Sequence, residues 1–251
     1  MILHLRAWVP DMRKITRCPA GILVDGLRAI GHGNLRMIRF DGLLWHDRRW
    51  LLDAFGMAAT ALPPTTFAIE PSTGLLVGVR QVLSPHYDAR PAGSSLDLVV
   101  IHCISLPPGE FGGPWIDRLF SGSLPFAEHS YFETLRGMRV SAHVLITRSG
   151  DITQFVPFTA RAWHAGRSSW RGREACNDFS VGIELEGIES AGYAEEQYHT
   201  LRALLAALFA TYPSLTFENM VAHSDIAPDR KTDPGPSFQW DRIRGDAPLL
   251  V

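Results

Sequence analysis

Two histidines and one aspartate occupy positions from which a β-sheet could deliver them to one site. His102 and His223 each follow a short apolar run, and Asp233 lies ten residues after His223 in a loop rich in proline and glycine. Side chains at strand ends and in adjoining loops commonly project into binding sites. Two imidazoles and one carboxylate, with a fourth position left to water, form a ligand set for catalytic zinc. Taken singly, each residue has an ordinary alternative role, as a hydrogen-bonded structural histidine or a turn-forming aspartate.

Glu184 lies in an alternating segment, residues 180–186, whose odd-numbered apolar residues face one side and whose even-numbered residues face the other. A carboxylate on a buried face is costly unless it is paired. Glu184 therefore either meets a cation or a metal-bound water, or lies on a solvated face without a role. Secondary candidates, for which the sequence favours supporting or structural roles, are His143, His164 and Asp225.

Lys231 is unusual because the chain has 22 arginines and only 2 lysines, the other being Lys14. A solvated loop charge is the ordinary role of a lysine near an aspartate. In this chain, arginine serves almost everywhere that a generic positive charge is needed. Lysine offers a compact point charge that a planar guanidinium does not mimic, so the composition indicates a specific role for Lys231.

The three cysteines, Cys18, Cys103 and Cys176, include no CxxC pair, which argues against a disulfide framework and against a zinc ribbon. Cys103 follows His102 and raises the alternative of a thiol nucleophile. Adjacent residues on a strand face opposite sides, however, so the pattern favours a buried, inert cysteine.

Alternating strands and helices are predicted to position these residues. The predicted strands are 98–101, 142–147, 152–156, 180–185 and 221–222, and the predicted helices are 115–120 and 194–211. Residues 224–236 are rich in Pro, Gly and Asp and predict an irregular loop. This interleaving predicts an α/β (α+β) domain with a central mixed β-sheet flanked by helices.

Composition and charge limit the function further. The 251 residues include 46% hydrophobic and 20% charged residues with a net charge of −2, and mean hydropathy is near zero. These values argue against a membrane protein and a disordered chain, and no run of like charge suggests nucleic-acid or membrane binding. No signal peptide or apolar stretch of 18 residues is present, so we expect a cytoplasmic protein whose ligand is a small molecule.

A domain boundary is expected near the two adjacent prolines of the segment 61–66. Residues 1–62 hold nine basic and five acidic side chains, whereas residues 63–251 hold fifteen and twenty-one. We therefore expect an N-terminal extension of uncertain structure and role over residues 1–62 and a catalytic domain over residues 63–251.

Six segments carry a resemblance to a known family. They are SPHYDARP (84–91), VVIHCISLPPGEFGG (99–113), RVSAHVLITRSGDITQFVPF (139–158), RAWHAG (161–166), CNDFSVGIELEG (176–187) and HSDIAPDRKTDPGP (223–236). Together they closely resemble the cytoplasmic 1,6-anhydro-N-acetylmuramyl-L-alanine amidases of Gram-negative bacteria, which belong to the amidase-2, peptidoglycan-recognition-type family. The resemblance covers roughly residues 70–245. It implies a central mixed β-sheet flanked by helices, with one zinc ion in a groove.

The resemblance also implies roles for particular residues. The implied zinc ligands are His102, His223 and Asp233, the implied acid/base is Glu184, and the implied oxyanion-stabilising residue is Lys231. Arg139 and Trp163 match positions that line the substrate groove, where the arginine is suited to bind a peptide carboxylate. Two departures bear on substrate affinity: Cys103 stands where the family commonly has a substrate-binding asparagine, and Ala175 stands where it often has arginine.

The implied reaction is hydrolysis of the amide bond between anhydro-N-acetylmuramic acid and L-alanine in muropeptides, by a monomer. This reaction would serve peptidoglycan recycling and restrain β-lactamase induction. Three alternatives remain at this stage: a peptidoglycan-recognition module that binds without cutting, a cysteine peptidase using Cys103 or Cys176, and an exported cell-wall amidase. A non-catalytic module typically lacks a zinc ligand, and an exported enzyme requires a signal peptide.

Overall fold

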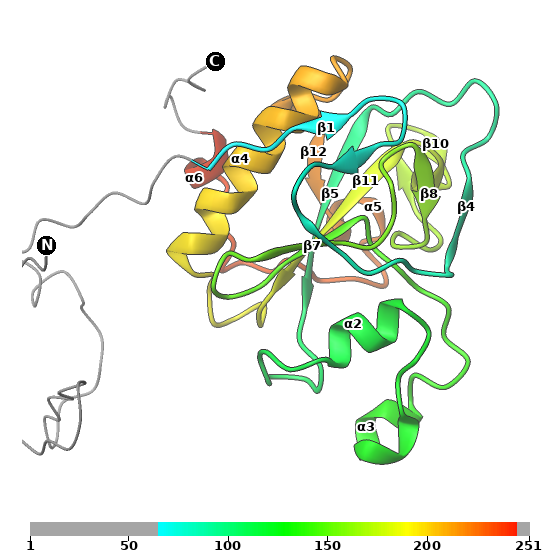
Figure 1. Ribbon diagram of the computed structural model, residues 1–251, viewed down its shortest axis with the longest axis vertical. Coiled ribbons are helices and arrows are strands. Elements are labelled where there is room, and N and C mark those ends of the chain that lie inside the picture. Colours follow the sequence, from blue (N-terminus) through cyan, green and yellow to red (C-terminus); the bar gives the residue numbers. More distant parts are fainter. Residues whose placement is uncertain (1–64, 245–251) are drawn as a thin grey trace, which may run out of the picture. The chain divides into compact units, whose positions relative to one another are not determined.

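The computed structural model describes residues 65–244, and Figure 1 shows a central sheet in this part of the chain. Its six strands are arranged in the order β12, β5, β11, β6, β7, β3. Their bounds are Met220–Ala222 (β12), Leu98–Ile104 (β5), Ser180–Glu186 (β11), Val144–Ile146 (β6), Ile152–Gln154 (β7) and Arg80–Gln81 (β3). All neighbouring pairs are parallel except β6 and β7, which are antiparallel. The predicted mixed sheet is confirmed.

Strands β5 and β11 form the centre of the sheet because their apolar, largely β-branched residues suit burial on both faces. On one face, Val181, Ile183 and Leu185 of β11 pack in the main apolar cluster with residues of helix α4 (Glu195–Thr211). Figure 1 shows α4 lying across the sheet. The helix begins where the Gln197 side chain accepts a hydrogen bond from the backbone of Ala194, at 3.0 Å. The predicted helix and the predicted alternation along β11 are confirmed.

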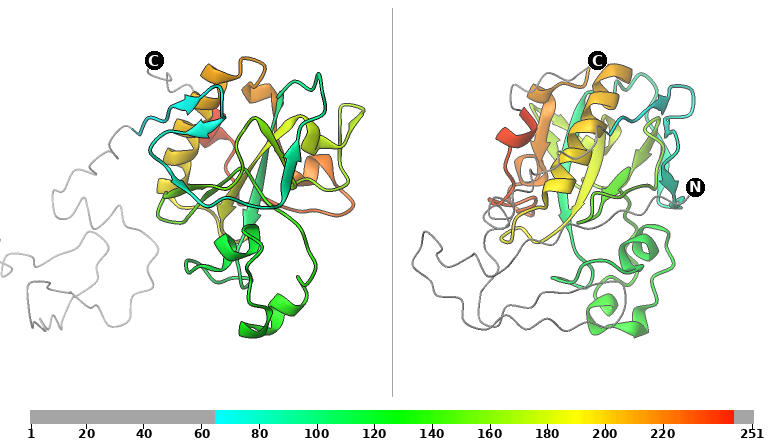
Figure 2. Two further views of the ribbon diagram at one scale, coloured as in Figure 1. Left: turned by 45° about the vertical axis from the view of Figure 1, so that its right-hand side comes forward. Right: turned by 60° about the vertical axis from the view of Figure 1, so that its left-hand side comes forward.

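The opposite face carries the even-numbered residues of β5 and β11, among them His102 and Glu184. Separate apolar clusters lie on this side, one of them built with helix α2 (Trp115–Phe120) and helix α3 (Ser130–Glu133). Figure 2 shows α2 and α3, in green, beyond the end of the sheet at which β5 finishes. The polar residues of the predicted site thus lie on the face that α4 leaves uncovered.

Smaller elements complete the described part of the chain. Three two-stranded antiparallel sheets pair β1 (Ile69–Glu70) with β2 (Leu75–Leu76), β4 (Tyr87–Ala89) with β8 (Ala160–Ala162), and β9 (Ser169–Trp170) with β10 (Arg173–Glu174). The remaining elements are the 3-10 helices η2 (Phe126–Glu128), η3 (Cys176–Asp178) and η4 (Phe217–Asn219) and the helices α5 (His223–Ile226) and α6 (Asp241–Arg244). Their short lengths leave no periodic pattern in the sequence.

Helix α5 corrects the prediction that residues 224–236 form only an irregular loop. Its first turn is stabilised by the carboxylate of Asp225, which accepts a hydrogen bond at 2.8 Å from the backbone N–H of Ala222. The helix starts at His223, directly after β12, and therefore fixes the direction in which this histidine leaves the sheet.

Some expectations lie outside the described residues, including the boundary at residues 62 and 63 and the residues Lys14 and Cys18. Between residues 65 and 244, no helix combines the length and the apolar character needed to cross a membrane.

Candidate metal centre and active site

Strand register brings the predicted site residues together. His102 on β5 is paired directly with Glu184 on β11. Strand β12 ends at Ala222, which is paired with Ile101, so the next residue, His223, reaches the level of His102. Because these strands are parallel and end on the same side, three polar side chains from distant parts of the sequence meet there.

His102, His223 and Asp233 form a buried cluster. Nδ1 of His102 lies 2.9 Å from Nδ1 of His223 and 3.2 Å from Oδ2 of Asp233, and Nδ1 of His223 lies 3.1 Å from the same oxygen. Ligand atoms in tetrahedral directions at about 2.0–2.1 Å from a zinc ion lie about 3.3 Å apart. The spacing of the three atoms therefore fits a zinc ion with a fourth coordination position left open.

Protonation also fits a metal site. Burial lowers the pKa of His102 to about 4, so its ring is neutral near pH 7, as a metal-binding imidazole must be. Asp233 is held in place by its own backbone, because its carbonyl accepts a hydrogen bond at 3.0 Å from the N–H of Ser224 in α5. Helix α5 and the loop after it thus supply two of the three potential ligands.

Glu184 is buried, with 9% of its surface exposed. Its Oε2 is one of three buried side-chain atoms in residues 65–244 that have no hydrogen-bond partner. Burial, reinforced by the negative charge of Asp233 and opposed by the positive charge of Lys231, raises the pKa of Glu184 to about 8. The burial of Glu184 excludes the interpretation that it lies on a solvated face. Glu184 instead lies beside the metal cluster.

Lys231 lies in the loop between α5 and Asp233, where its backbone N–H donates to the carbonyl of Ala227 at 2.9 Å. Its side chain is half-buried. The positive charge of the ammonium group partly offsets the rise in the pKa of Glu184 and contributes to the lowering of the pKa of His102. The loop therefore carries a compact positive charge that acts electrostatically on the carboxylate and on the metal cluster.

The sequence matches the family described as N-acetylmuramoyl-L-alanine amidase (Amidase_2) over residues 92–236. The chain belongs to this amidase family. The 1,6-anhydro-N-acetylmuramyl-L-alanine amidase AmpD of Escherichia coli K12 is 57% identical over 171 residues, which are 68% of this chain and 93% of the relative. AmpD of Haemophilus influenzae is 50% identical over 169 residues, 67% of this chain and 92% of the relative. A crystal structure of a selenomethionine AmpD derivative superposes with a TM-score of 0.68 at 55% identity, covering 70% of this chain and 97% of the other.

Trp163 and Arg139 of the amidase domain both lie near His86. The Trp163 indole stacks on the His86 ring with centroids 6.1 Å apart. Arg139 is exposed and lines, together with His86, a hollow of about 240 Å³. The structure thus brings these two predicted substrate-binding residues near one another, and their contact with substrate stays a prediction.

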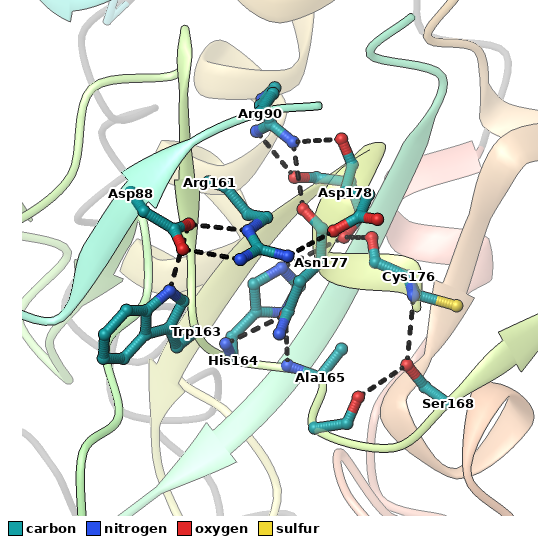
Figure 3. Close-up of polar contacts among 12 residues, drawn as sticks. Asp88, Arg90, Arg161, Trp163, His164, Ala165, Ser168, Cys176, Asn177 and Asp178 are labelled. Atoms are coloured by element: carbon teal, nitrogen blue, oxygen red, sulfur yellow. Dashed lines mark hydrogen bonds and ion pairs between the residues drawn. The ribbon is translucent and has the colours of Figure 1, made fainter. Parts of the chain in front are cut away.

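An ion-pair network fixes Trp163 (Figure 3). The indole N–H donates to Asp88 at 3.2 Å, and Asp88 accepts at 2.6 Å from Nε of Arg161. Arg161 also donates to Asp178 at 2.6 Å. The guanidinium lowers the pKa of Asp88 and keeps it ionised. Strands β4 and β8 and the helix η3 thereby hold the tryptophan ring in one orientation.

Neither cysteine of the amidase domain belongs to the cluster of three potential ligands. Cys103 lies beside Gly187 and Tyr193, and burial raises the pKa of its thiol to about 12. Cys176 is fully buried, and burial raises its pKa as well. Both thiols are therefore protonated near pH 7, unlike the thiolate of a cysteine peptidase.

Ala175 is exposed and precedes η3 with a φ of 57°.

Two secondary candidates have structural roles. His143 is fully buried, accepts from the backbone N–H of Gly182 at 3.0 Å and donates to the carbonyl of Ala160 at 3.2 Å. Burial holds its pKa well below its usual value, so the ring is neutral. Asp225 caps the first turn of α5 through the N–H of Ala222.

The third secondary candidate, His164, contacts the cluster directly, because its Nδ1 lies 2.9 Å from Nε2 of His102. Residue patterns in the sequence indicate no role for Asp88, Arg161 or Asn177. Each lies in or beside a short element without periodicity, and only the match of the surrounding segments to the family marked them.

Proposed function

We propose that this protein is a zinc-dependent hydrolase that cleaves the amide bond between 1,6-anhydro-N-acetylmuramic acid and the L-alanine of muropeptides. In this proposal it acts as a monomer in the cytoplasm, recycles peptidoglycan fragments and, by removing muropeptides, restrains β-lactamase induction. Residues 63–251 form the catalytic domain. One zinc ion is held by His102, His223 and Asp233.

The observation that carries the proposal is the meeting of three metal-ligating atoms with a buried carboxylate oxygen that has no partner, Oε2 of Glu184. The names and coverage of the AmpD relatives support the substrate, since the match spans more than nine-tenths of those proteins. The retained set of three potential ligands disfavours a module that only binds peptidoglycan.

Glu184 is the proposed general base and acid. It takes a proton from the attacking water as the oxygen–carbon bond forms, and it passes this proton to the nitrogen of L-alanine as the carbon–nitrogen bond breaks. A pKa raised to about 8 by burial suits both steps, because acid/base catalysts work best when their pKa lies near the working pH. Zinc bound at the cluster would supply Lewis acidity, which activates water and polarises a carbonyl.

Lys231 is the proposed oxyanion donor. Negative charge develops on the carbonyl oxygen during attack, and a positioned cation stabilises that charge more than the neutral ground state. The electrostatic effect of the Lys231 charge on both Glu184 and His102 supports this role.

The test of the proposed function is incubation of the purified protein with an anhydro-muropeptide, followed by mass spectrometry. We expect release of free stem peptide and of the anhydro-sugar, loss of activity after treatment with a chelator, and recovery on addition of zinc. Treatment with a thiol-alkylating reagent should leave the activity intact. Chelator-resistant or alkylation-sensitive cleavage would contradict the proposal.

Replacing Lys231 by arginine tests the oxyanion role. If Lys231 supplied only a loop charge, Lys231→Arg would be nearly silent. A donor to the oxyanion must occupy one point that the larger planar group cannot reach, and loss of one such donor lowers kcat on the order of 10²- to 10³-fold. The matched control, Arg202→Lys on α4, makes the reverse exchange on the opposite face and should keep wild-type kcat. Near wild-type turnover of Lys231→Arg would refute the role.

The proposed domain boundary is tested by a protein that begins at residue 63. The described residues from 65 onward contain the whole central sheet and the site, and they belong to one compact unit, Leu62–Val251. We therefore expect the shortened protein to fold and to retain wild-type kcat and KM. Loss of activity with an unchanged circular dichroism spectrum would show that residues 1–62 contribute to the site.

A further inference from the structure

The proton on the His223 ring is fixed by a backbone carbonyl. Nε2 of His223 lies 3.3 Å from the carbonyl oxygen of Ala165, which can only accept a hydrogen bond. A neutral His223 ring therefore carries its proton on Nε2. The lone pair on Nδ1 then points at the other atoms of the metal cluster.

The proton on the His102 ring is fixed by a longer chain of hydrogen bonds. The hydroxyl of Ser180 donates at 2.6 Å to the carbonyl of Cys176, so its oxygen must accept from Nε2 of His164, 3.0 Å away. Nδ1 of His164 consequently carries a lone pair and accepts from Nε2 of His102 at 2.9 Å. His102, like His223, is left with its lone pair on Nδ1.

Two lone pairs and a carboxylate oxygen thus converge within 3.2 Å of one another without a proton to share. Such an arrangement is unfavourable unless a cation lies among the three atoms. The hydrogen bonds behind His102 and His223 therefore prepare both rings for a metal, as outer-shell partners of metal-bound histidines commonly do.

One side chain holds both partners in place (Figure 3). Oδ1 of Asn177 accepts hydrogen bonds from the backbone N–H groups of His164, at 3.1 Å, and Ala165, at 2.8 Å. These consecutive residues supply the two acceptors, the His164 ring and the Ala165 carbonyl. The His164 ring is also confined by Gly182, where a Cβ would lie 2.4 Å from its Cγ.

We propose that Asn177 is a positioning residue for the metal centre: by holding the His164–Ala165 backbone, it fixes the orientation and the ring proton of both ligand histidines. Asn177 itself lies in η3 and donates no atom to the cluster. The inference rests on the proposed function, because it requires a metal ion bound by His102, His223 and Asp233.

The test measures zinc dissociation constants of the full-length protein by competition with a chromophoric chelator. Asn177→Leu removes the acceptor at similar volume and should weaken zinc binding on the order of 10- to 100-fold. Asn177→Asp keeps an acceptor oxygen and should restore affinity to within a few-fold of wild type. The matched control is Ser168→Ala, which removes the side-chain hydrogen bonds with the backbone N–H of Cys176 and the carbonyl of Gly166 but none with residues 164 and 165. It should bind zinc like wild type.

A second readout separates positioning from general loosening. With Co²⁺ in place of zinc, the visible absorption bands should shift in Asn177→Leu but not in Ser168→Ala, because only the former changes the orientation of the ligand rings. If Asn177→Leu is not recovered folded, Ser180→Ala provides the test. It removes the acceptor for Nε2 of His164 in the chain of hydrogen bonds that leads to His102, and it should also weaken zinc binding.

Unchanged zinc affinity in the variant that is recovered, or equal losses in Asn177→Leu and Ser168→Ala, would overturn the inference and leave the proposed function standing. Failure of the wild-type protein to bind zinc would instead overturn the proposed metal site, and this inference with it.

Discussion

Replacing His223 by alanine is expected to abolish both zinc retention and amidase activity. His223 is 2% exposed, and its Nδ1 lies within 3.1 Å of the other two ligand atoms, so its replacement removes one of three convergent ligand atoms. The remaining pair, His102 and Asp233, is too few for a stable zinc site in proteins, where three protein ligands are usual in catalytic centres. Metal analysis of the purified variant and the muropeptide assay measure the two losses.

The matched control is His199→Ala, which removes an imidazole from α4 on the opposite face of the sheet. It should keep about one zinc per chain and wild-type turnover. Since metal binding adds to the free energy of unfolding, a chelator should lower the Tm of wild type and of His199→Ala but not of His223→Ala. Full activity of His223→Ala in a metal-free preparation would end the zinc interpretation.

The main features of the site could be predicted because they follow from strands with clear patterns. The apolar run before His102 and the alternation around Glu184 identify the two central strands, and parallel neighbours must end on one side. What the pattern could not decide was whether Glu184 faced solvent. That depends on what packs on the face opposite α4, where separate apolar clusters lie, and this is a property of the packing and not of the strand itself.

The surroundings of the ligands could not be predicted from residue patterns. Asn177 acts through two backbone N–H groups thirteen and twelve residues earlier in the chain, and such contacts leave no period in the sequence. Helix α5 is one turn long and depends on the capping contact of Asp225, which proline and glycine in the same segment obscure. Short elements of this kind are fixed by tertiary contacts. Only the resemblance to the family indicated that their segments matter for function.

Glu184→Gln is expected to lower kcat on the order of 10²- to 10⁴-fold while zinc stays bound, because the amide keeps the shape of the side chain but accepts no proton. The exchange breaks no hydrogen bond of Oε2, because that oxygen has none. A variant that has lost its zinc would identify Glu184 as a support of the metal site instead. Metal analysis beside steady-state kinetics therefore separates the two roles.

The same variant makes the raised pKa of Glu184 measurable in the metal-free protein. Burial raises this pKa to about 8 in the folded state, against about 4.3 in an unfolded chain. Between these values the folded state holds a proton that the unfolded state has released, so the free energy of unfolding falls as pH rises. This contribution is complete below about pH 4.3 and is lost through about pH 8. Glutamine does not titrate.

Urea denaturation of chelator-treated wild type and Glu184→Gln at pH 5, 7 and 9 isolates this effect, because all other titrating groups are common to both proteins. The free energy of unfolding of wild type should decline relative to the variant from pH 5 to pH 9. Parallel pH profiles would show that the pKa of Glu184 is the same in the folded and unfolded states, and would contradict the effect of burial. The sign of the difference thus tests whether burial controls the titration of Glu184. The same burial makes Glu184 a suitable proton acceptor and donor near neutral pH.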